Sequence, residues 1–277
     1  MNGIPFVKMH GLGNDFVVID GRRRSIRLTE AQARAIADRH TGVGCDQIVL
    51  LEAAETDLAD VAMRIFNADG GEVASCGNAS RCIAALLMEE LDRNHVVIET
   101  SAELLDAERG RDGMISVDLG LPRLEWRDIP LSEPADTLHL GISSGPLRDP
   151  AAVNVGNPHA VFFVDDADAV DLATLGPKLE HHDMFPERAN IEVAQVLSVA
   201  SIRVRVWERG AGLTRACGTG ACAALVAASR RGLTGRRAEI VLDGGALGVE
   251  WLKDDHVLLT GPAAVTFAGT LDEGLLR

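Results

Sequence analysis

Lysine is nearly absent from this chain of 277 residues, which contains only Lys8, Lys178 and Lys253. An amino-acid racemase that uses pyridoxal phosphate needs a lysine that forms a Schiff base next to a phosphate-binding segment. None of the three lysines lies in such a segment. The scarcity of lysine therefore argues against pyridoxal phosphate as a cofactor.

Long apolar segments are also missing from the chain. No run approaches the roughly 18 uninterrupted apolar residues that mark a membrane-spanning helix, and the N-terminal residues lack the pattern of a secretory signal peptide. The five cysteines are an odd number and do not suggest a disulfide framework. These features predict a cytoplasmic protein with free thiols and no membrane partner.

Positive charge is scarce as well, since the formal net charge is −14. Arg22, Arg23 and Arg24 form the one basic run near the start, which we interpret as a solvated loop. Without a basic stripe, binding to nucleic acid is not expected. The hydrophobic fraction of 47% is ample for the core of one large domain or two ordinary domains.

Two segments of the chain share one design. Residues 67–82 read Asn-Ala-Asp-Gly-Gly-Glu-Val-Ala-Ser-Cys-Gly-Asn-Ala-Ser-Arg-Cys, and residues 209–222 read Arg-Gly-Ala-Gly-Leu-Thr-Arg-Ala-Cys-Gly-Thr-Gly-Ala-Cys. Each glycine-rich turn ends in Cys-Gly followed by Asn or Thr, and an apolar run comes next. We expect a helix after each turn, with Asn78 and Thr219 as the N-cap residues.

The position of Cys76 and Cys217 in these turns suggests a specific chemistry. Free N–H groups and the helix dipole at a helix N-terminus stabilise an anion, either a thiolate or a bound carboxylate. If the two copies face each other, one cysteine can remove a proton from one face of a carbon while the other delivers a proton to the opposite face. That reaction is stereoinversion by general acid and base catalysis.

Other roles for these cysteines remain open at this point. A buried cysteine is often an inert small apolar residue, an interpretation that suits Cys82 and Cys222 within the apolar runs. A zinc site is a second alternative, formed by Cys76, Cys82, Cys217 and Cys222, although the usual structural spacing places two to four residues between paired cysteines. A redox dithiol normally shows Cys-x-x-Cys, which this chain lacks.

The remaining pattern predicts an α+β fold with many short strands around one central helix in each of two lobes. Thr29 and Gln32 form a capping box for a helix that extends to about Arg39. The helix from Thr219 to about Arg230 is apolar on almost all sides and should be buried. We place the first lobe at residues 1–119, completed by residues 264–277, and the second lobe at residues 120–263.

Several further motifs occur in a fixed order along the chain. They are Gly11-Leu-Gly-Asn-Asp-Phe16, Asn67-Ala-Asp-Gly70 with Ser75-Cys-Gly-Asn78, Gly156-Asn-Pro-His159, Glu187-Arg-Ala-Asn190, and Trp207-Glu-Arg-Gly-Ala-Gly212 with Ala216-Cys-Gly-Thr-Gly-Ala-Cys222. In this order they resemble the diaminopimelate epimerase family, which comprises cofactor-independent amino-acid epimerases of the lysine and peptidoglycan precursor pathway. The resemblance spans nearly the whole chain and is weakest between about residues 100 and 150.

The resemblance implies two pseudo-symmetric lobes, each a mainly antiparallel curled sheet around a central helix, with the active site between them. It also implies a homodimer that acts on diaminopimelate. Cys76 and Cys217 match the base and acid pair of the family, and His159 and Glu208 match residues that support catalysis. The family's substrate-binding positions match Asn14, Gln47, Asn67, Gly77, Asn78, Asn157, Asn190, Glu208, Arg209, Gly218 and Thr219.

The chemistry of these residues suits a substrate with two amino-acid head groups. The two helix N-termini can bind the carboxylate at the reacting carbon, and Glu208 with the His159 region can bind the ammonium group there. Arg209 and the asparagines can hold the remote head group. A proline or hydroxyproline racemase shares the two-cysteine plan, but its substrate lacks a remote head group that Arg209 would bind.

Overall fold

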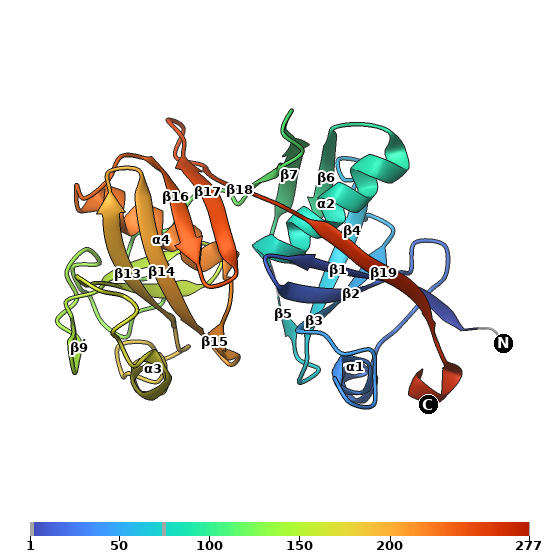
Figure 1. Cartoon of the computed structure of the whole chain (residues 1–277), viewed down its shortest axis with the longest axis horizontal. Coiled ribbons are helices and arrows are strands. Elements are labelled where there is room, and N and C mark those ends of the chain that lie inside the picture. Colours follow the sequence, from blue (N-terminus) through green and yellow to red (C-terminus); the bar gives the residue numbers. More distant parts are fainter. Residues whose placement is uncertain (1–2, 74–75, 277) are drawn as a thin grey trace. The chain divides into compact units, whose positions relative to one another are not determined.

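The structure is a computed structural model that describes residues 3–73 and 76–276. The chain divides into two compact units, one formed by residues 1–117 with residues 261–277 and the other by residues 118–260 (Figure 1). The described residues form nineteen strands and four α-helices. The predicted α+β class is therefore confirmed. No helix within the described ranges is long and apolar enough to cross a membrane.

In the sheet of the first unit, β1 lies between β2 and β19 and is antiparallel to both. β2 is parallel to β3, β3 is antiparallel to β4, and β4 is parallel to β6, after which β7 and β8 continue the sheet in antiparallel pairs. β5 forms a short antiparallel pair with β4. The bounds are β1 (Ile4–Gly11), β2 (Asn14–Asp20), β3 (Gln47–Glu52), β4 (Val61–Asn67), β5 (Glu72–Val73), β6 (His95–Glu99), β7 (Leu104–Arg109), β8 (Ile115–Asp118) and β19 (Ala264–Leu271).

Two helices cover this sheet because its strands alternate buried residues toward both faces. Val17 and Ile48 belong to the apolar cluster that α1 (Glu30–Ala37) closes with Ile36. α2 (Gly77–Leu91) instead contacts β1, β6 and β7. The capping box predicted at the start of α1 is confirmed, since Thr29 and Gln32 exchange hydrogen bonds between side chain and backbone.

The second unit repeats the strand order of the first. β11 is antiparallel to β12, β12 is parallel to β13, β13 is antiparallel to β14, and β14 is parallel to β16. β17 follows β16, β18 follows β17, and β15 adds a short pair to β14, as β5 does to β4. The bounds are β9 (Ser143–Ser144), β10 (Leu147–Arg148), β11 (Ala151–Asn154), β12 (Pro158–Phe163), β13 (Asn190–Ser198), β14 (Ser201–Glu208), β15 (Gly212–Thr214), β16 (Arg237–Leu242), β17 (Gly245–Trp251) and β18 (Val257–Gly261).

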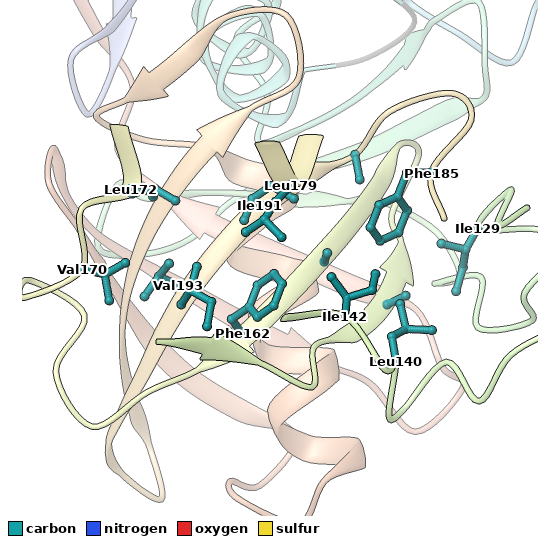
Figure 2. Packing of buried hydrophobic residues seen from close by; sticks show 14 of the residues in the cluster. Ile129, Leu140, Ile142, Phe162, Val170, Leu172, Leu179, Phe185, Ile191 and Val193 are labelled. Atoms are coloured by element: carbon teal, nitrogen blue, oxygen red, sulfur yellow. The ribbon is translucent and has the colours of Figure 1, made fainter. Parts of the chain in front are cut away.

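Helices again lie on both faces of this second sheet. α4 (Gly218–Arg230) contacts β11, β12, β13, β14, β16 and β17, and it lies behind β13, β14 and β16 in Figure 1. Its residues 218–228 are all buried, which confirms the prediction of a buried helix. α3 (Leu172–Glu180) lies on the other face, where Leu172 and Leu179 pack into one apolar cluster with Phe162, Ile191 and Val193 (Figure 2).

The predicted N-caps of the two cysteine helices were wrong by two residues. α2 and α4 begin at Gly77 and Gly218, so Cys76 and Cys217 themselves are the N-cap residues. The side chain of Asn78 is engaged elsewhere, because its amide nitrogen donates to Asn14 at 3.1 Å. At the other helix the Cys217 sulfur accepts a hydrogen bond from the Gly220 N–H at 3.4 Å, and thus acts as the cap.

Candidate active site

The first group of predicted site residues lies in the first unit, where strands end beside the start of α2. β2 begins at Asn14, β3 begins at Gln47 and β4 ends at Asn67, and the strand register places Gln47 opposite Asn67. Gln47 Nε2 donates a hydrogen bond to Asn67 Oδ1 at 2.9 Å. In the part of the chain that the structure describes, the buried Gln47 Oε1 has no protein partner and is therefore an acceptor that a ligand can use.

A chain of hydrogen bonds fixes how the amides of this group are oriented. The fully buried Arg81 donates to Asn78 Oδ1 at 2.7 Å, and Asn78 Nδ2 donates to Asn14 Oδ1 at 3.1 Å. Asn14 Nδ2 then donates to Asp46 Oδ2 at 3.0 Å. Because a guanidinium can only donate and a carboxylate can only accept, each amide in between has one allowed orientation.

Cys76 lies beside this chain of amides. Its sulfur is 3.9 Å from Asn14 Oδ1, the same oxygen that accepts from Asn78. The thiol is partly exposed, and its backbone carbonyl accepts from the N–H and hydroxyl of Ser80 in the first turn of α2. Gly77 is the first residue of the helix. Ser75, which precedes the cysteine in the motif, lies outside the described residues.

Cys217 lies in a different environment within the second unit. It is buried at the N-terminus of α4, where its sulfur is 3.5 Å from Thr219 Oγ1 and accepts from the Gly220 N–H. Burial raises the pKa of the Cys217 thiol well above its ordinary value, and the charge of Glu208 raises it further, although the hydrogen bonds from Thr219 and Gly220 act in the opposite direction. Burial and the charge of Glu208 thus favour the thiol form of Cys217 over the thiolate.

Glu208 ends β14 and accepts a hydrogen bond from the Thr214 hydroxyl. Burial raises the pKa of the Glu208 carboxyl, although hydrogen bonds from Thr214 and Cys217 and the positive charge of His159 lower it. The charge of Glu208 thus makes a Cys217 thiolate less favourable, whereas the Cys217 thiol favours the carboxylate form of Glu208. The pair suits a site in which one proton is held and then released.

His159 on β12 forms a buried hydrogen-bonded series with Glu192 on β13 and with Asn157, which precedes β12. Its Nδ1 lies 2.7 Å from Glu192 Oε1, and its Nε2 lies 2.7 Å from Asn157 Oδ1. The side chains of His159 and Glu192 are both 0% exposed. Burial raises the pKa of Glu192, opposed by the charge of His159 and its hydrogen bond.

Asn190 and Arg209 complete the group in the second unit. Asn190 Nδ2 donates to the Pro158 carbonyl at 2.9 Å, and its Oδ1 accepts from the Arg209 N–H at 2.9 Å. The guanidinium of Arg209 donates to the carbonyl of Glu187 at 3.0 Å. Asn190 therefore holds the backbone at Arg209, directly after β14. One guanidinium N–H of Arg209 bonds to Glu187, and the other guanidinium N–H groups are further donors of this side chain.

The strand registers relate the two groups position by position. Phe16 pairs with Gln47 between the parallel β2 and β3, as His159 pairs with Asn190 between the parallel β12 and β13. The equivalent positions that follow are Asn14 and Asn157, Phe16 and His159, Gln47 and Asn190, Val49 and Glu192, Asn67 and Glu208, and Cys76 and Cys217. Both units therefore have a helix-capping cysteine and polar residues at equivalent strand positions. The second unit has titratable residues, His159, Glu192 and Glu208, where the first unit has residues that do not titrate.

Three polar residues that support this site, Glu192, Arg81 and Asp46, were not predicted from the sequence. Glu192 stands within Asn-Ile-Glu-Val-Ala, among residues that alternate between two buried faces of a strand. A carboxylate in such a run was the available signal, because an unpaired buried charge is costly and needs a partner. Its partner His159 is 33 residues away in sequence, so only the strand pairing identifies it.

Comparison with known proteins places the whole chain in one family. A sequence profile described as diaminopimelate epimerase matches residues 6–125 and 151–266. A diaminopimelate epimerase of Rhodospirillum centenum is 62% identical over 271 residues, which cover 98% of this chain and 93% of that protein. The corresponding protein of Acidiphilium cryptum is 57% identical, with 98% of each chain covered.

The chain belongs to the diaminopimelate epimerase family.

Membership of the diaminopimelate epimerase family makes the chain an isomerase. Solved structures at lower identity show the same fold. A probable proline racemase from Agrobacterium radiobacter has a TM-score of 0.72 at 19% identity, covering 97% of this chain and 93% of that one. A hydroxyproline epimerase from Agrobacterium vitis, with bound trans-4-hydroxy-L-proline, has a TM-score of 0.70 at 18% identity, covering 97% and 92%.

In this member of the diaminopimelate epimerase family, Gly220 is tightly enclosed at the first turn of α4. A Cβ at Gly220 would lie 2.9 Å from Glu192 Oε1 and 3.3 Å from Val206 Cγ2. We expect Gly220→Ala to lower the free energy of unfolding by about 1–3 kcal/mol, the usual cost of overpacking. Gly235→Ala is the matched control, because a Cβ there has no atom within 4 Å. Urea unfolding of both variants measures the difference, and equal stability would contradict the tight contact.

Proposed function

We propose that this protein converts LL-2,6-diaminopimelate to meso-diaminopimelate with Cys76 and Cys217 as acid and base. The observation that supports this most strongly is the repetition of one design in both units, a cysteine at the N-cap of a helix beside polar residues of the same unit. An enzyme that inverts a stereocentre needs one acid or base on each face of the carbon. A repeated cysteine design supplies one such group per unit.

The proposed reaction exchanges one proton for another at a single α-carbon. A thiolate removes the α-proton as the C–H bond breaks, and the electron pair is delocalised into the α-carboxylate. The other cysteine, present as a thiol, delivers its proton to the opposite face, which forms a new C–H bond and leaves a thiolate. Each cysteine thus ends in the protonation state that the other had at the start, and no cofactor or metal takes part.

Substrate recognition follows from the donors and acceptors of the two groups. Backbone N–H groups at Gly77–Asn78 and Gly218–Thr219 open α2 and α4, where a carboxylate is favoured. The carboxylate of Glu208 is suited to the α-ammonium, and His159 supports catalysis at the same end. We assign the remote head group to Arg209 together with Asn14, Gln47, Asn67, Asn157 and Asn190. Their acceptors include Gln47 Oε1, which has no partner among the described residues.

In this proposal the Cys76 lobe consists of residues 1–119 with residues 264–277, and the Cys217 lobe consists of residues 120–263. The product, meso-diaminopimelate, serves lysine and peptidoglycan precursor synthesis, and we place the enzyme in the cytoplasm. A net charge of −14 is compatible with this substrate, because diaminopimelate carries two ammonium and two carboxylate groups and is neutral overall.

A stereochemical assay tests the proposal. The purified protein is incubated with LL-diaminopimelate and, separately, with L-proline in metal-free deuterated buffer, and the isomers are resolved over time. We expect meso-diaminopimelate with deuterium at one α-carbon, and no change in proline. Inversion of proline instead would favour the racemase alternative. Loss of activity on metal removal, with about one zinc per chain, would favour the zinc alternative.

We further propose that the protein acts as a homodimer, formed through β19. The side chains of Val265 and Phe267 on this strand are 58% and 47% exposed, and Phe267 contacts Phe6 edge-on at 5.9 Å between ring centroids. Adjacent exposed apolar residues on a strand are typical of an interface. Phe267→Asp should therefore convert the dimer to a monomer in sedimentation equilibrium. Leu58→Asp, at an isolated leucine that is 72% exposed, should leave the dimer intact. A dimer in both variants, or a monomeric native protein, would refute this assignment.

A further inference from the structure

A charged pair is buried in the second unit at a place where the first unit has two apolar residues. His159 and Glu192 are both inaccessible to solvent, and their strand positions are equivalent to those of Phe16 and Val49. Phe16 and Val49 are also fully buried. Burying an ion pair usually costs more than burying apolar residues of similar volume. The pair is therefore not explained by packing alone.

The location of Glu192 connects this pair to the Cys217 helix. Its strand neighbours Ile191 and Val193 point into the apolar cluster beside α3 (Figure 2), so Glu192 projects to the other face, toward α4. A Cβ at Gly220 would be 2.9 Å from Glu192 Oε1, which places the carboxylate against the first turn of α4. Gly220 is three residues after Cys217 on α4, so the Glu192 carboxylate lies near the Cys217 thiol.

The hydrogen bonds of His159 determine how many protons the pair holds. Asn157 Oδ1 accepts from Nε2, so Nε2 carries a proton. The 2.7 Å bond between Nδ1 and Glu192 Oε1 needs a second proton, whether it is placed on the nitrogen or on the oxygen. Together the two side chains hold two protons and no net charge. A neutral imidazole without Glu192 would hold only one of these protons.

We propose that Glu192 is a positioning residue for the epimerisation, which holds the ring of His159 by Nδ1 and keeps a second proton on the His159–Glu192 pair while Nε2 donates to Asn157. This inference rests on the proposed function, in which His159 supports catalysis. Two other titratable groups lie near the pair, Glu208 and Cys217, and both interact electrostatically with it. Glu192 touches neither substrate nor reacting carbon in this role and acts through the histidine.

Glu192→Gln tests the inference at nearly constant volume. The glutamine can still bond to Nδ1 but cannot share the second proton, so the ring stays in place while the pair loses a proton. We expect kcat to fall about 10- to 100-fold, as when the partner that orients a functional histidine is removed. KM should change little, because the proton matters most in the transition state. The acidic limb of the pH profile of kcat should also be displaced.

The ¹⁵N chemical shifts of His159 provide a readout that does not depend on activity. In the native protein we expect a protonated Nε2 and a strongly hydrogen-bonded Nδ1, and in Glu192→Gln a neutral ring with one protonated nitrogen. Asp149→Asn is the matched control, since it removes an exposed carboxylate 2.8 Å from His139 Nδ1 in the same unit. This control should alter neither the His159 shifts nor kcat.

Several outcomes would overturn the inference. One is native kcat in Glu192→Gln, and another is native kcat in Glu192→Val, which copies Val49 of the first unit. A native His159 with an unprotonated Nε2 would also overturn it, even if both variants failed to fold. If the native protein had the expected His159 shifts but did not epimerise diaminopimelate, the proposed function would fail and the role of Glu192 in that reaction would fail with it, while its hold on His159 would stand.

Discussion

Cys76→Ala should lower kcat for LL-diaminopimelate by about 10²- to 10⁴-fold, the range for losing one positioned acid or base. Cys217→Ala should lower it by a similar factor, because the proposed reaction uses each cysteine once in every turnover. The rates are measured by resolving the stereoisomers of diaminopimelate over time. Deuterium incorporation from solvent at the α-carbon reports proton transfer in both directions.

The other cysteines of the same two helices provide matched controls. Cys82 in α2 and Cys222 in α4 are fully buried, and burial raises the pKa of the Cys82 thiol to about 12. Such a thiol is inert as a base at neutral pH. Cys82→Ala and Cys222→Ala should therefore keep native kcat and cost only stability, about 1–2 kcal/mol each. Native activity in Cys76→Ala or Cys217→Ala would refute the mechanism.

Glu208→Gln should change activity and thiol acidity in opposite directions. We expect kcat to fall about 10²-fold, since the variant loses the carboxylate that binds the α-ammonium and exchanges a proton with Cys217. The charge of Glu208 raises the pKa of the Cys217 thiol, so its removal should lower that pKa. The thiolate of Cys217 should then form at lower pH than in the native protein.

An ultraviolet titration of thiolate absorbance measures the second effect. Repeating the titration in Cys217→Ala identifies the part that comes from this thiol. Glu239→Gln is the control, because Glu239 lies exposed on β16 of the same unit, and neither kcat nor the titration should change. If the Cys217 pKa stayed unchanged or rose in Glu208→Gln, the electrostatic coupling described here would be wrong.

Local sequence signals predicted the helices and strands of this fold more readily than their contacts. Alternation, the capping pattern at Thr29 and the apolar run after Cys217 depend on neighbouring residues, and the structure contains the corresponding elements. The N-caps were misplaced because a cysteine is an unusual cap, and Asn78 looked like a better one. Its amide is instead held by Arg81 and Asn14, a contact that spans 64 residues.

The residues of the candidate site also differ in whether local sequence or long-range contacts identify them. The motifs placed both cysteines and their asparagines by resemblance, and these assignments remain predictions. Glu192 escaped notice because its role depends on the parallel pairing of β12 with β13, which no short segment encodes. Only that pairing brings the carboxylate to His159. Buried charges in strands are therefore the residues that sequence reasoning should examine first.

The repeated strand order has an evolutionary consequence. Two identical half-length chains that associate as a dimer must carry the same residue at equivalent positions, so any mutation appears in both copies. In a single chain that carries both units each can diverge alone, and the equivalent strand positions hold Phe16 and Val49 in one unit and His159 and Glu192 in the other. A single chain thus permits chemically different halves, and selection can adjust the acidity of one cysteine without altering the other.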